Sequence, residues 1–464
     1  MTAVIILIFV LGYLTITLEH PLKLDKTVPA LLMAAIMWAL LAIGFHQGWF
    51  SLIDGHETVF KVINGVIDDQ TEEGFTNLLL HHLGKTAEIL VFLIGAMTIV
   101  EIIDLHRGFE ILKGWVRTKS KTRLLWIIAI LAFFLSAVID NLTATIVLIT
   151  LLRKLVRDRN ERIWFAGLII IAANAGGAWS PIGDVTTTML WIGKRVSAAH
   201  LVERLFLPSL VNLVVPVFLA SKFIPAFKGN LKVAKDEDTT EITKLLSSQT
   251  MLFLGLGMIL FVPVFKTVTH LPPYLGMMLG LGVVWLVSEF IHPEEDFTEE
   301  RKKQYSANQA LSRIEMSSIL FFLGILMAVA ALETLVYGTV MINGEAVSVG
   351  TLRYLAEMLS HAIPNQDIVI SLLGVLSAII DNVPLVAASM GMYDAPMDAS
   401  IWHLIAYAAG TGGSMLIIGS AAGVAAMGME KIDFIWYMKK ISWLAVVGYI
   451  LGYILLLFME SLKM

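Results

Sequence analysis

Long runs of apolar residues constrain the fold of this chain more than any other feature of its sequence. Each run is close to the length of about 20 residues that an α-helix needs to cross the hydrocarbon core of a bilayer. The runs occupy residues 2–18, 27–45, 86–104, 250–265, 272–291, 316–337 and 441–459. The sequence therefore predicts an all-α polytopic membrane protein, a multi-pass chain whose main surroundings are the lipid bilayer.

The composition agrees with this prediction and argues against several classes of function. Of the 464 residues, 57% are hydrophobic and 15% are charged, whereas a soluble domain is near half apolar with about a quarter charged. The net charge of −5 is spread along the chain, without a basic patch that would bind nucleic acid. The absence of cysteine excludes disulfides and thiolate metal sites. We expect no nucleic-acid partner, no resident cofactor and no enzymatic activity.

Two motifs occur twice in the chain and in the same order. Residues 136–142 read SAVIDNL, and residues 377–383 read SAIIDNV. Residues 173–183 read ANAGGAWSPIG, and residues 409–419 read AGTGGSMLIIG, so that the Gly-Gly pair and the final Gly align. The offsets of 241 and 236 residues are nearly equal, which indicates an internal repeat. We predict two repeats and a cytoplasmic linker, at 1–227, 250–464 and 228–249 respectively.

The distribution of Lys and Arg predicts a re-entrant helical hairpin in the first repeat. Loop 105–123 holds six Lys and Arg residues and loop 153–162 holds five, so both belong in the cytoplasm. The 29 residues of 124–152 that separate them are too few for two crossings. Each arm would be about 21 Å long, against a hydrocarbon core of about 30 Å. The hairpin turn falls at Asp140-Asn141.

The second repeat shows the opposite charge pattern. No Lys or Arg occurs from 354 to 430, and the predicted hairpin 367–389 is flanked by acidic residues. This hairpin is expected to enter from outside, with Asp381-Asn382 at its turn. Segments 163–193 and 401–430 are each expected to cross once and to be broken by glycines. Each repeat then has three spans, a hairpin, a broken span and a final span, so the second copy is inverted, as in secondary transporters.

The residues at these four breaks predict a small-cation site. Irregular backbone at membrane depth survives only inside protein or along a cavity. No Lys or Arg lies within the hairpins or the broken spans, so an anion would lack a charged partner. Carboxylate, amide and hydroxyl oxygens suit Na⁺ or Li⁺. The candidate cation- and proton-binding residues are Asp140, Asn141, Asn174, Asp184, Thr186, Thr187, Ser377, Asp381, Asn382, Thr411, Ser414 and Ser420.

Clustered carboxylates also provide a means of exchange. Burial and like charge both favour the protonated form of a carboxyl group. A carboxylate that holds a proton when the cation is absent, and loses it when the cation binds, couples the two movements. We predict Na⁺/H⁺ antiport by competition at Asp140, Asp184 and Asp381, which would be the ligands of the transported Na⁺.

The same segments resemble a known family. SAVIDNLTATIVL at 136–148, GGAWSPIGDVTTTMLW at 176–191, SAIIDNVPLVAAS at 377–389 and GTGGSMLIIGSAAG at 410–423 are similar to NhaD-type sodium/proton antiporters of the ion transporter superfamily. The resemblance implies export of cytoplasmic Na⁺ or Li⁺ in exchange for H⁺ across a bacterial inner membrane. It also implies a homodimer with elevator-type alternating access. Dicarboxylate relatives carry Ser-Asn-Thr at the turns, where this chain carries Asp-Asn.

Three alternatives stay open at this point. The first is an arsenite or carboxylate transporter of the same superfamily. The second is an intramembrane aspartyl protease, although the residue two before Gly183 is Pro181 and not the glycine of the usual Gly-x-Gly-Asp setting. The third is that the Asp-Asn turns only cap helices, since both residues are good N-caps. Against the third, carboxylates at membrane depth are costly and usually functional.

Overall fold

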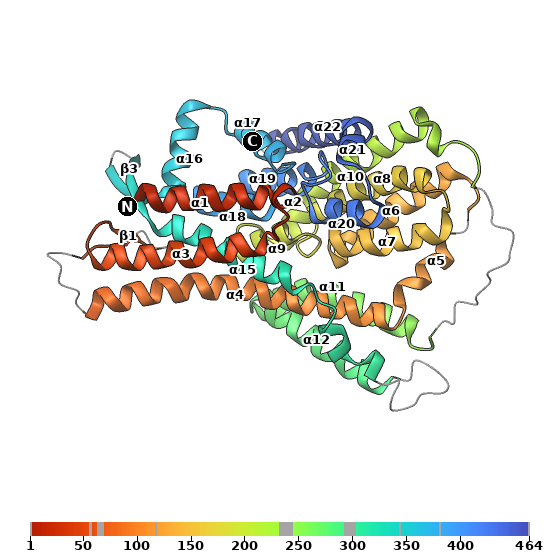
Figure 1. The fold of residues 1–464 in the computed structure, drawn as a ribbon, viewed down its shortest axis with the longest axis horizontal. Coiled ribbons are helices and arrows are strands. Elements are labelled where there is room, and N and C mark those ends of the chain that lie inside the picture. The colour runs from red at the N-terminus through yellow and green to blue at the C-terminus, as the bar shows by residue number, and fades with distance from the viewer. Residues whose placement is uncertain are drawn as a thin grey trace. The chain divides into compact units, whose positions relative to one another are not determined.

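The structure is a computed structural model, and it confirms the all-α prediction (Figure 1). It describes residues 2–54, 58–62, 69–116, 118–231, 245–291, 303–342, 345–379 and 382–462. Within these ranges, 8 helices are long and apolar enough to cross a membrane, or 9 if the bent pair of helices at 351–376 counts as one span. The count includes α6 (Lys121–Ile139), which the sequence analysis assigns to a re-entrant hairpin, and it includes neither of the two predicted broken spans, so it is not a count of the predicted crossings.

The elements of the first half end with two helices joined by a single residue, a pair of helices separated by a short break, and a long final helix. They are α1 (Thr2–Thr17), α2 (Glu19–Leu22), α3 (Thr27–His46), β1 (Leu52–Ile53), β2 (Val59–Phe60), α4 (Asp69–Leu105), η1 (Gly108–Glu110), α5 (Ile111–Trp115), α6 (Lys121–Ile139), α7 (Asn141–Leu155), α8 (Arg159–Ala178), α9 (Val185–Ile192), α10 (Ala198–Phe223) and η2 (Pro225–Phe227).

The second half repeats that order and adds a β-hairpin before its own helical hairpin. Its elements are α11 (Ser248–Thr269), α12 (Pro273–Phe290), η3 (Lys303–Tyr305), α14 (Ala307–Leu311), α15 (Met316–Thr334), β3 (Val336–Ile342), β4 (Glu345–Gly350), α16 (Thr351–Ala362), α17 (Gln366–Leu376), α18 (Asn382–Met392), α19 (Ser400–Gly412), α20 (Ala421–Glu430), α21 (Phe434–Lys440) and α22 (Ser442–Ser461).

The antiparallel pair β3–β4 is an element that the sequence analysis did not predict. Its register runs from Val336 opposite Gly350 to Ile342 opposite Glu345. The dipeptide between the strands is Asn343-Gly344, a typical hairpin-turn sequence, although these two residues lie outside the described ranges. The two strands are only 7 and 6 residues long, so a search for apolar runs of membrane-spanning length does not identify them.

The described chain folds into two compact units, each drawn from both halves of the sequence. Unit 1 comprises Met1–Leu90, Glu315–Leu372 and Val383–Pro396, and unit 2 comprises Val91–Ile314, Leu373–Asn382 and Met397–Met464. In unit 1, α3 packs between α1 and α15 (Figure 1). In unit 2, α8 packs against α6, α7, α10, α19 and α20, so it is the central helix of that unit. The predicted division into repeats along the chain stays a prediction.

Contacts inside unit 2 recur at matching positions of the two halves. A side chain at Gly176 would overlap the carbonyl oxygen of Phe133, and one at Gly412 would overlap that of Gly374. These glycines let each broken span approach the backbone of its hairpin closely. Ser136 Oγ donates to the carbonyl of Ala173 at 2.6 Å, as Ser377 Oγ does to that of Ala409 at 3.0 Å. Such matched contacts support the repeat seen in the sequence.

Candidate functional site

The tip of the first hairpin is a single residue, Asp140, between α6 and α7. Its backbone has φ 74° and ψ 160°, a conformation that ends one helix and turns the chain into the next. Its Oδ1 accepts from the backbone N–H of Thr143 at 2.9 Å, and its Oδ2 accepts from the Thr143 hydroxyl at 2.9 Å. Asp140 is therefore a helix N-cap, as one of the alternatives expected. Its two oxygens each use one lone pair in this way, which leaves acceptor capacity for a cation.

The break between α8 and α9 carries the second carboxylate, Asp184. This residue caps α9, because its Oδ1 accepts from the backbone N–H of Thr186 at 2.8 Å and from the Thr186 hydroxyl at 2.6 Å. The Thr187 hydroxyl donates to the carbonyl of Asp184 at 3.0 Å. The residue is 2% exposed. Buried carboxylates are costly unless they are hydrogen-bonded or paired with a cation.

The second oxygen of Asp184 brings both hairpin tips to one point. Asn141 Nδ2 donates to Asp184 Oδ2 at 2.5 Å, and Asn382 Nδ2 lies 3.5 Å from the same atom. Asn141 follows the tip of the first hairpin, and Asn382 begins α18 of the second. The two copies of the Asp-Asn motif therefore meet at a carboxylate of the first half. Asp381 lies outside the described residues, so its predicted role stays a prediction.

Asn174 links the two broken spans. Its Oδ1 accepts from Asn141 Nδ2 at 3.1 Å, and its Nδ2 donates to the hydroxyls of Ser414 at 2.9 Å and Ser420 at 2.8 Å. Asn174 is fully buried. We refer to Asp140, Asn141, Asn174, Asp184, Asn382, Ser414 and Ser420 as the junction.

Two predicted site residues in the second half bind backbone rather than the junction. The Thr411 hydroxyl donates to the carbonyl of Tyr407 at 2.6 Å, one turn earlier in α19. Ser377 Oγ donates to Ala409, as described above. In contrast, Ser420 both caps α20, at 3.2 Å from the Gly423 N–H, and reaches Asn174. The structure therefore brings together the amides, Asp184, Ser414 and Ser420, and leaves these two hydroxyls in helix-packing roles.

The junction combines negative charge with neutral polar groups. The charges of Asp140 and Asp184 act on each other. In α7 and α8, Lys and Arg occur only in the last turn of α7 and the first turn of α8, and α9, α19 and α20 carry none. Among the described residues, no three His, Cys, Asp or Glu side chains gather closely enough to hold a metal by themselves. A cation here would need amide, hydroxyl or carbonyl oxygens as well as carboxylates. Oxygen ligands of this kind suit hard cations.

Sequence reasoning missed one residue that supports the junction. Tyr437 in α21 is fully buried, and its hydroxyl donates to the carbonyl of Ser414 at 2.9 Å. The residue lies well beyond the repeated motifs, in a segment with basic neighbours, so no local signal pointed to it. Tyr437 holds the backbone at the beginning of the second break, where the helical carbonyls have lost their own partners.

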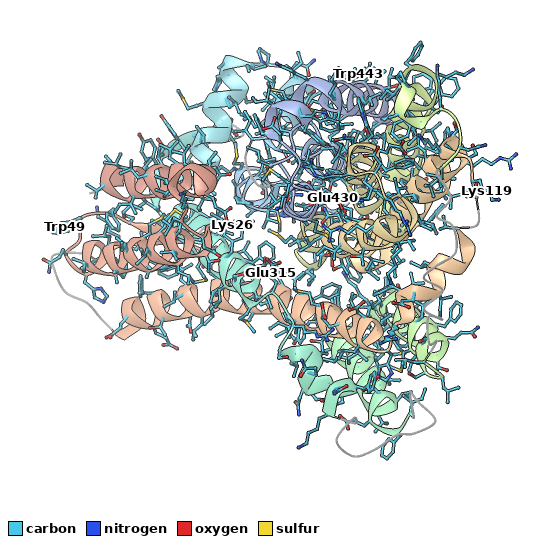
Figure 2. All side chains as sticks on the ribbon, turned by 45° about the vertical axis from the view of Figure 1, so that its right-hand side comes forward. Lys26, Trp49, Lys119, Glu315, Glu430 and Trp443 are labelled. Atoms are coloured by element: carbon cyan, nitrogen blue, oxygen red, sulfur yellow. The ribbon has the colours of Figure 1, made fainter. Side chains whose placement is uncertain are left out.

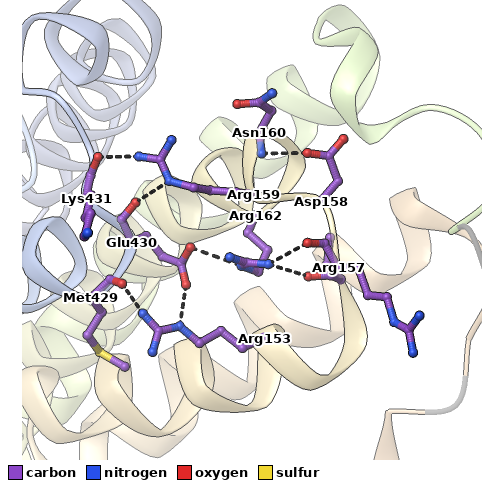
Figure 3. Close-up of polar contacts among 10 residues, drawn as sticks. Arg153, Arg157, Asp158, Arg159, Asn160, Arg162, Met429, Glu430 and Lys431 are labelled. Carbon is purple, nitrogen blue, oxygen red and sulfur yellow. Dashed lines mark hydrogen bonds and ion pairs between the residues drawn. The ribbon is translucent and has the colours of Figure 1, made fainter. Parts of the chain in front are cut away.

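A separate ionic cluster lies at the end of α20 and was also not predicted. Glu430 is 2% exposed, and its carboxylate pairs with Arg153 Nε at 2.7 Å and Arg162 Nε at 3.1 Å. Arg159 Nε donates to the carbonyl of Glu430 at 3.0 Å, and Arg153 also binds the carbonyl of Met429 (Figure 3). Figure 2 shows Glu430 among the helices of unit 2 and Lys119 at their margin. The cluster ties α7 and α8 of the first half to α20 of the second.

The sequence is similar to known membrane transporters over nearly its whole length. Residues 6–406 match the family described as "Citrate transporter". The chain is 44% identical over 450 residues to "Sodium/proton antiporter 1" of Arabidopsis thaliana, which covers 96% of this chain and 70% of that protein. It is 32% identical over 471 residues to "Na(+)/H(+) antiporter NhaD" of Vibrio cholerae, covering 97% and 89%. "Sodium/proton antiporter 2" of Arabidopsis thaliana is 40% identical, with 96% and 97% covered.

Proposed function

The chain belongs to a family of membrane transporters that includes the NhaD-type sodium/proton antiporters, and from this membership we propose that it exchanges Na⁺ or Li⁺ for protons. It is a multi-pass membrane protein and a transporter rather than an enzyme. The relatives named above come from a plant as well as from a bacterium. The bacterial inner membrane therefore stays a proposal that rests on the resemblance of the sequence motifs.

One observation carries the proposal: both hairpin tips donate amides to the single buried carboxylate of Asp184. An amide N–H beside a carboxylate oxygen occupies the position that a cation would take. When a cation enters, rotation of the amide about its last bond offers the oxygen in place of the nitrogen. The junction therefore has a cation-free arrangement and a cation-bound arrangement built from the same side chains.

Proton coupling follows from the charge of the junction. Two or three carboxylates in a site without cationic side chains repel one another, and the repulsion is relieved either by a proton or by a metal cation. When Na⁺ binds at Asp184 and Asp140, its charge relieves the repulsion and the carboxyl group loses its proton. When Na⁺ leaves, protonation of a carboxylate becomes favourable again. We propose Asp381 as the third member on the ground of its repeated motif.

Transport also requires access from each side in turn. We propose that unit 2, which contains the junction, moves as the transporting part of an elevator, and that the protein is a homodimer. The resemblance of the motifs supports both statements. The Glu430 cluster supports the elevator movement of unit 2, because its ion pairs and hydrogen bonds hold α7, α8 and α20 together. We propose that Na⁺ leaves the cytoplasm, a direction that the resemblance of the motifs implies.

The test is ion-driven pH change in everted membrane vesicles from cells that lack other antiporters. Addition of NaCl or LiCl to vesicles holding a preformed pH gradient should collapse it, while KCl and a sodium-free citrate salt should not. The citrate arm separates this proposal from the carboxylate carriers of the same family. Dependence of transport on citrate, with no response to Na⁺ or Li⁺ alone, would overturn it.

A pair of matched variants tests the role of Asp140. Asp140→Asn keeps the helix cap and removes the charge, and Asp158→Asn does the same at the exposed cap of α8, whose carboxylate accepts from Asn160 at 2.9 Å. We expect Asp140→Asn to lower the exchange rate at least about tenfold, since an interaction with a charged group contributes about 1.5–3 kcal/mol. Asp158→Asn should retain the normal rate. Normal exchange by Asp140→Asn would contradict the proposed mechanism.

A further inference from the structure

Buried polar atoms without a hydrogen-bond partner are concentrated where α10, α19 and α22 pack together. In high-resolution protein structures, the large majority of buried side-chain polar atoms have a hydrogen-bond partner. In the described part of this chain, the largest group of exceptions is at this interface. The atoms are Nε and Nη2 of Arg204, Oγ of Ser209, Nδ2 and Oδ1 of Asn212, Nδ1 and Nε2 of His403, and Oε1 of Glu460.

His403 is the centre of this group. It is 2% exposed, yet neither ring nitrogen makes a hydrogen bond to protein. Its Nδ1 lies 3.5 Å from Oε1 of Glu460, and its Nε2 lies 3.9 Å from Oδ1 of Asp398. Asp398 Oδ2 in turn lies 3.3 Å from Nδ1 of His200, whose side chain is 49% exposed. A titratable ring therefore lies between two carboxylates, one of which contacts an exposed imidazole.

Other charged groups around His403 come from few elements. From α10, Arg204, His200 and Glu203 act on it electrostatically, and from α22 the neighbouring group is Glu460. The described residues of α9 include no ionisable side chain. The charged residues of α8 lie in its first turn, beside the Glu430 cluster at the opposite end of the span. The buried ring therefore has carboxylates and a guanidinium group as its charged neighbours.

A polar stripe leads from His403 towards the junction. His403, Tyr407 and Thr411 are spaced four residues apart on α19 and so share one face, and Ser414 follows at the end of that helix. The Tyr407 hydroxyl donates to the carbonyl of Tyr449 at 3.1 Å. A side chain at Gly452 would overlap that hydroxyl, so the glycine makes room for the polar group. The stripe ends at Ser414, which binds Asn174 of the junction.

Alongside this stripe, α10 presents Arg204, Ser209 and Asn212, all buried and with side-chain atoms that lack protein partners. Each unsatisfied buried group would cost about 1–3 kcal/mol. Ordered water bound to several such groups removes that cost, and buried water typically makes about three hydrogen bonds. Water held between an imidazole, two carboxylates and a row of hydroxyl and amide groups also conducts protons.

We propose that His403, with Asp398 and Glu460, forms a second proton-binding site, connected to the junction by ordered water along α10, α19 and α22. This proposal rests on the proposed Na⁺/H⁺ exchange and says where its proton enters. Asp398 and Glu460 lie at the end of α19 and α22 that the loop charges place outside, so the site takes protons from the external solution.

The test separates proton movement from sodium movement. His403→Gln keeps the polar character and approximate size of the side chain but cannot take up a proton. Exchange of radiolabelled Na⁺ for unlabelled Na⁺ in proteoliposomes needs the junction and no net proton movement. His361→Gln, at an exposed position of α16, is the matched control.

We expect His403→Gln to lower Na⁺-driven proton movement by at least about tenfold, because glutamine cannot take up or release a proton and a positioned acid–base group speeds proton transfer by about 10²–10⁴-fold. Sodium self-exchange should stay within about twofold of the wild-type rate, and His361→Gln should alter neither measurement. Glu460→Gln should shift the dependence of proton movement on external pH in the direction of lower pH, because the carboxylate no longer favours the protonated ring.

Two results would overturn this inference. One is an unchanged rate and pH profile of proton movement in both His403→Gln and Glu460→Gln. The other is equal loss of proton movement and sodium self-exchange in both variants, which indicates a purely structural role. If wild-type vesicles show no Na⁺-driven proton movement at all, the proposed function itself has failed, and that result is distinct from these two.

Discussion

The two broken spans of unit 2 have nearly the same backbone and different chemistry. Asp184, which begins α9, has φ −148° and ψ 146°, and Ser420, which begins α20, has φ −147° and ψ 154°. In both breaks, a side chain on the second glycine of the Gly-Gly pair would come close to the carbonyl of the final glycine, at 2.5 Å for Gly177 and 2.6 Å for Gly413. Yet one break carries a carboxylate and the other a hydroxyl at the matching cap.

This difference shows how a duplicated scaffold acquires a single charged centre. Either residue satisfies the free N–H groups at the start of the following helix, because Asp and Ser are both good N-caps. Only Asp184 adds a negative charge that two hairpin amides can approach. Ser420 instead accepts one bond from Asn174. The backbone is therefore common to both halves, and the proposed coupling between cation and proton belongs mainly to the first.

The largest difference in activity is expected when the two N-cap residues, Asp184 and Ser420, are each changed to asparagine. Asparagine caps a helix about as well as Asp or Ser. Asp184→Asn removes the charged acceptor of two amide contacts, each contributing about 1.5–3 kcal/mol, so Na⁺-driven proton movement should fall about 100-fold or more. Ser420→Asn keeps both a cap and an acceptor for Asn174, so the change should stay within about threefold.

Both variants can be measured in everted vesicles by the collapse of a pH gradient after NaCl addition, at matched protein levels. Equal loss in Asp184→Asn and Ser420→Asn would refute the asymmetry between the two breaks. Sodium binding measured by calorimetry on the purified variants then distinguishes a lost cation site from lost proton coupling.

A smaller effect on stability, of similar size in both halves, is expected at the two glycines where a broken span lies close to the backbone of its hairpin. Gly176→Ala and Gly412→Ala would each push a methyl group into a carbonyl oxygen, at Phe133 and Gly374 respectively. Overpacking of this kind costs about 1–3 kcal/mol of stability. The melting temperatures of the two purified variants should fall by similar amounts, and Gly257→Ala, where nothing lies near the added carbon, should leave it unchanged. A large fall at only one of the first two positions would show that the two scaffolds are not equivalent.

Effects smaller than that of Asp184→Asn are expected at the two hairpin amides, and they should differ. Asn141 lies 2.5 Å from Asp184 Oδ2 and also binds Asn174, whereas Asn382 lies 3.5 Å from the same oxygen. Since hydrogen bonds weaken steeply beyond about 3.2 Å, Asn141→Ala should raise the Na⁺ concentration for half-maximal exchange about tenfold and Asn382→Ala only about twofold. Concentration series in the same vesicles give both values. The reverse order would show that the second hairpin contributes more of the cation site than this arrangement implies.

Much of the fold and part of the site could be predicted because local chemistry determines them. The lengths of the apolar runs determine which segments can be helices in a bilayer, and α3, α11, α12 and α22 follow those runs closely. The single-residue turn at Asp140 was predicted within the motif that contains it. Capping acts over two or three residues, so Asp184 and Ser420 could be recognised as special from their own neighbours.

The contacts that join the two halves could not be predicted in this way. Asn174 binds Ser414 and Ser420, which are 240 and 246 residues away in sequence. The partners of Glu430 lie 268 and 277 residues away, and no motif links them. Arg153 and Arg162 contributed to the sequence analysis only as positive charges of a cytoplasmic loop. Thr411 and Ser377 were also predicted for the site, and the hydroxyl of each donates to a backbone carbonyl, of Tyr407 and Ala409 respectively.

The sequence by itself determined that this chain is helical and membrane-spanning, and it predicted two halves of similar plan with acidic and amide residues at the breaks. Those properties depend on hydropathy, glycine and helix capping, which act between residues close together in the chain. Only the tertiary structure decided that both hairpin amides face Asp184, that Tyr437 supports Ser414, and that His403 lies between two carboxylates. Those arrangements depend on packing between distant helices, in which a rotation of one helix changes which side chains meet.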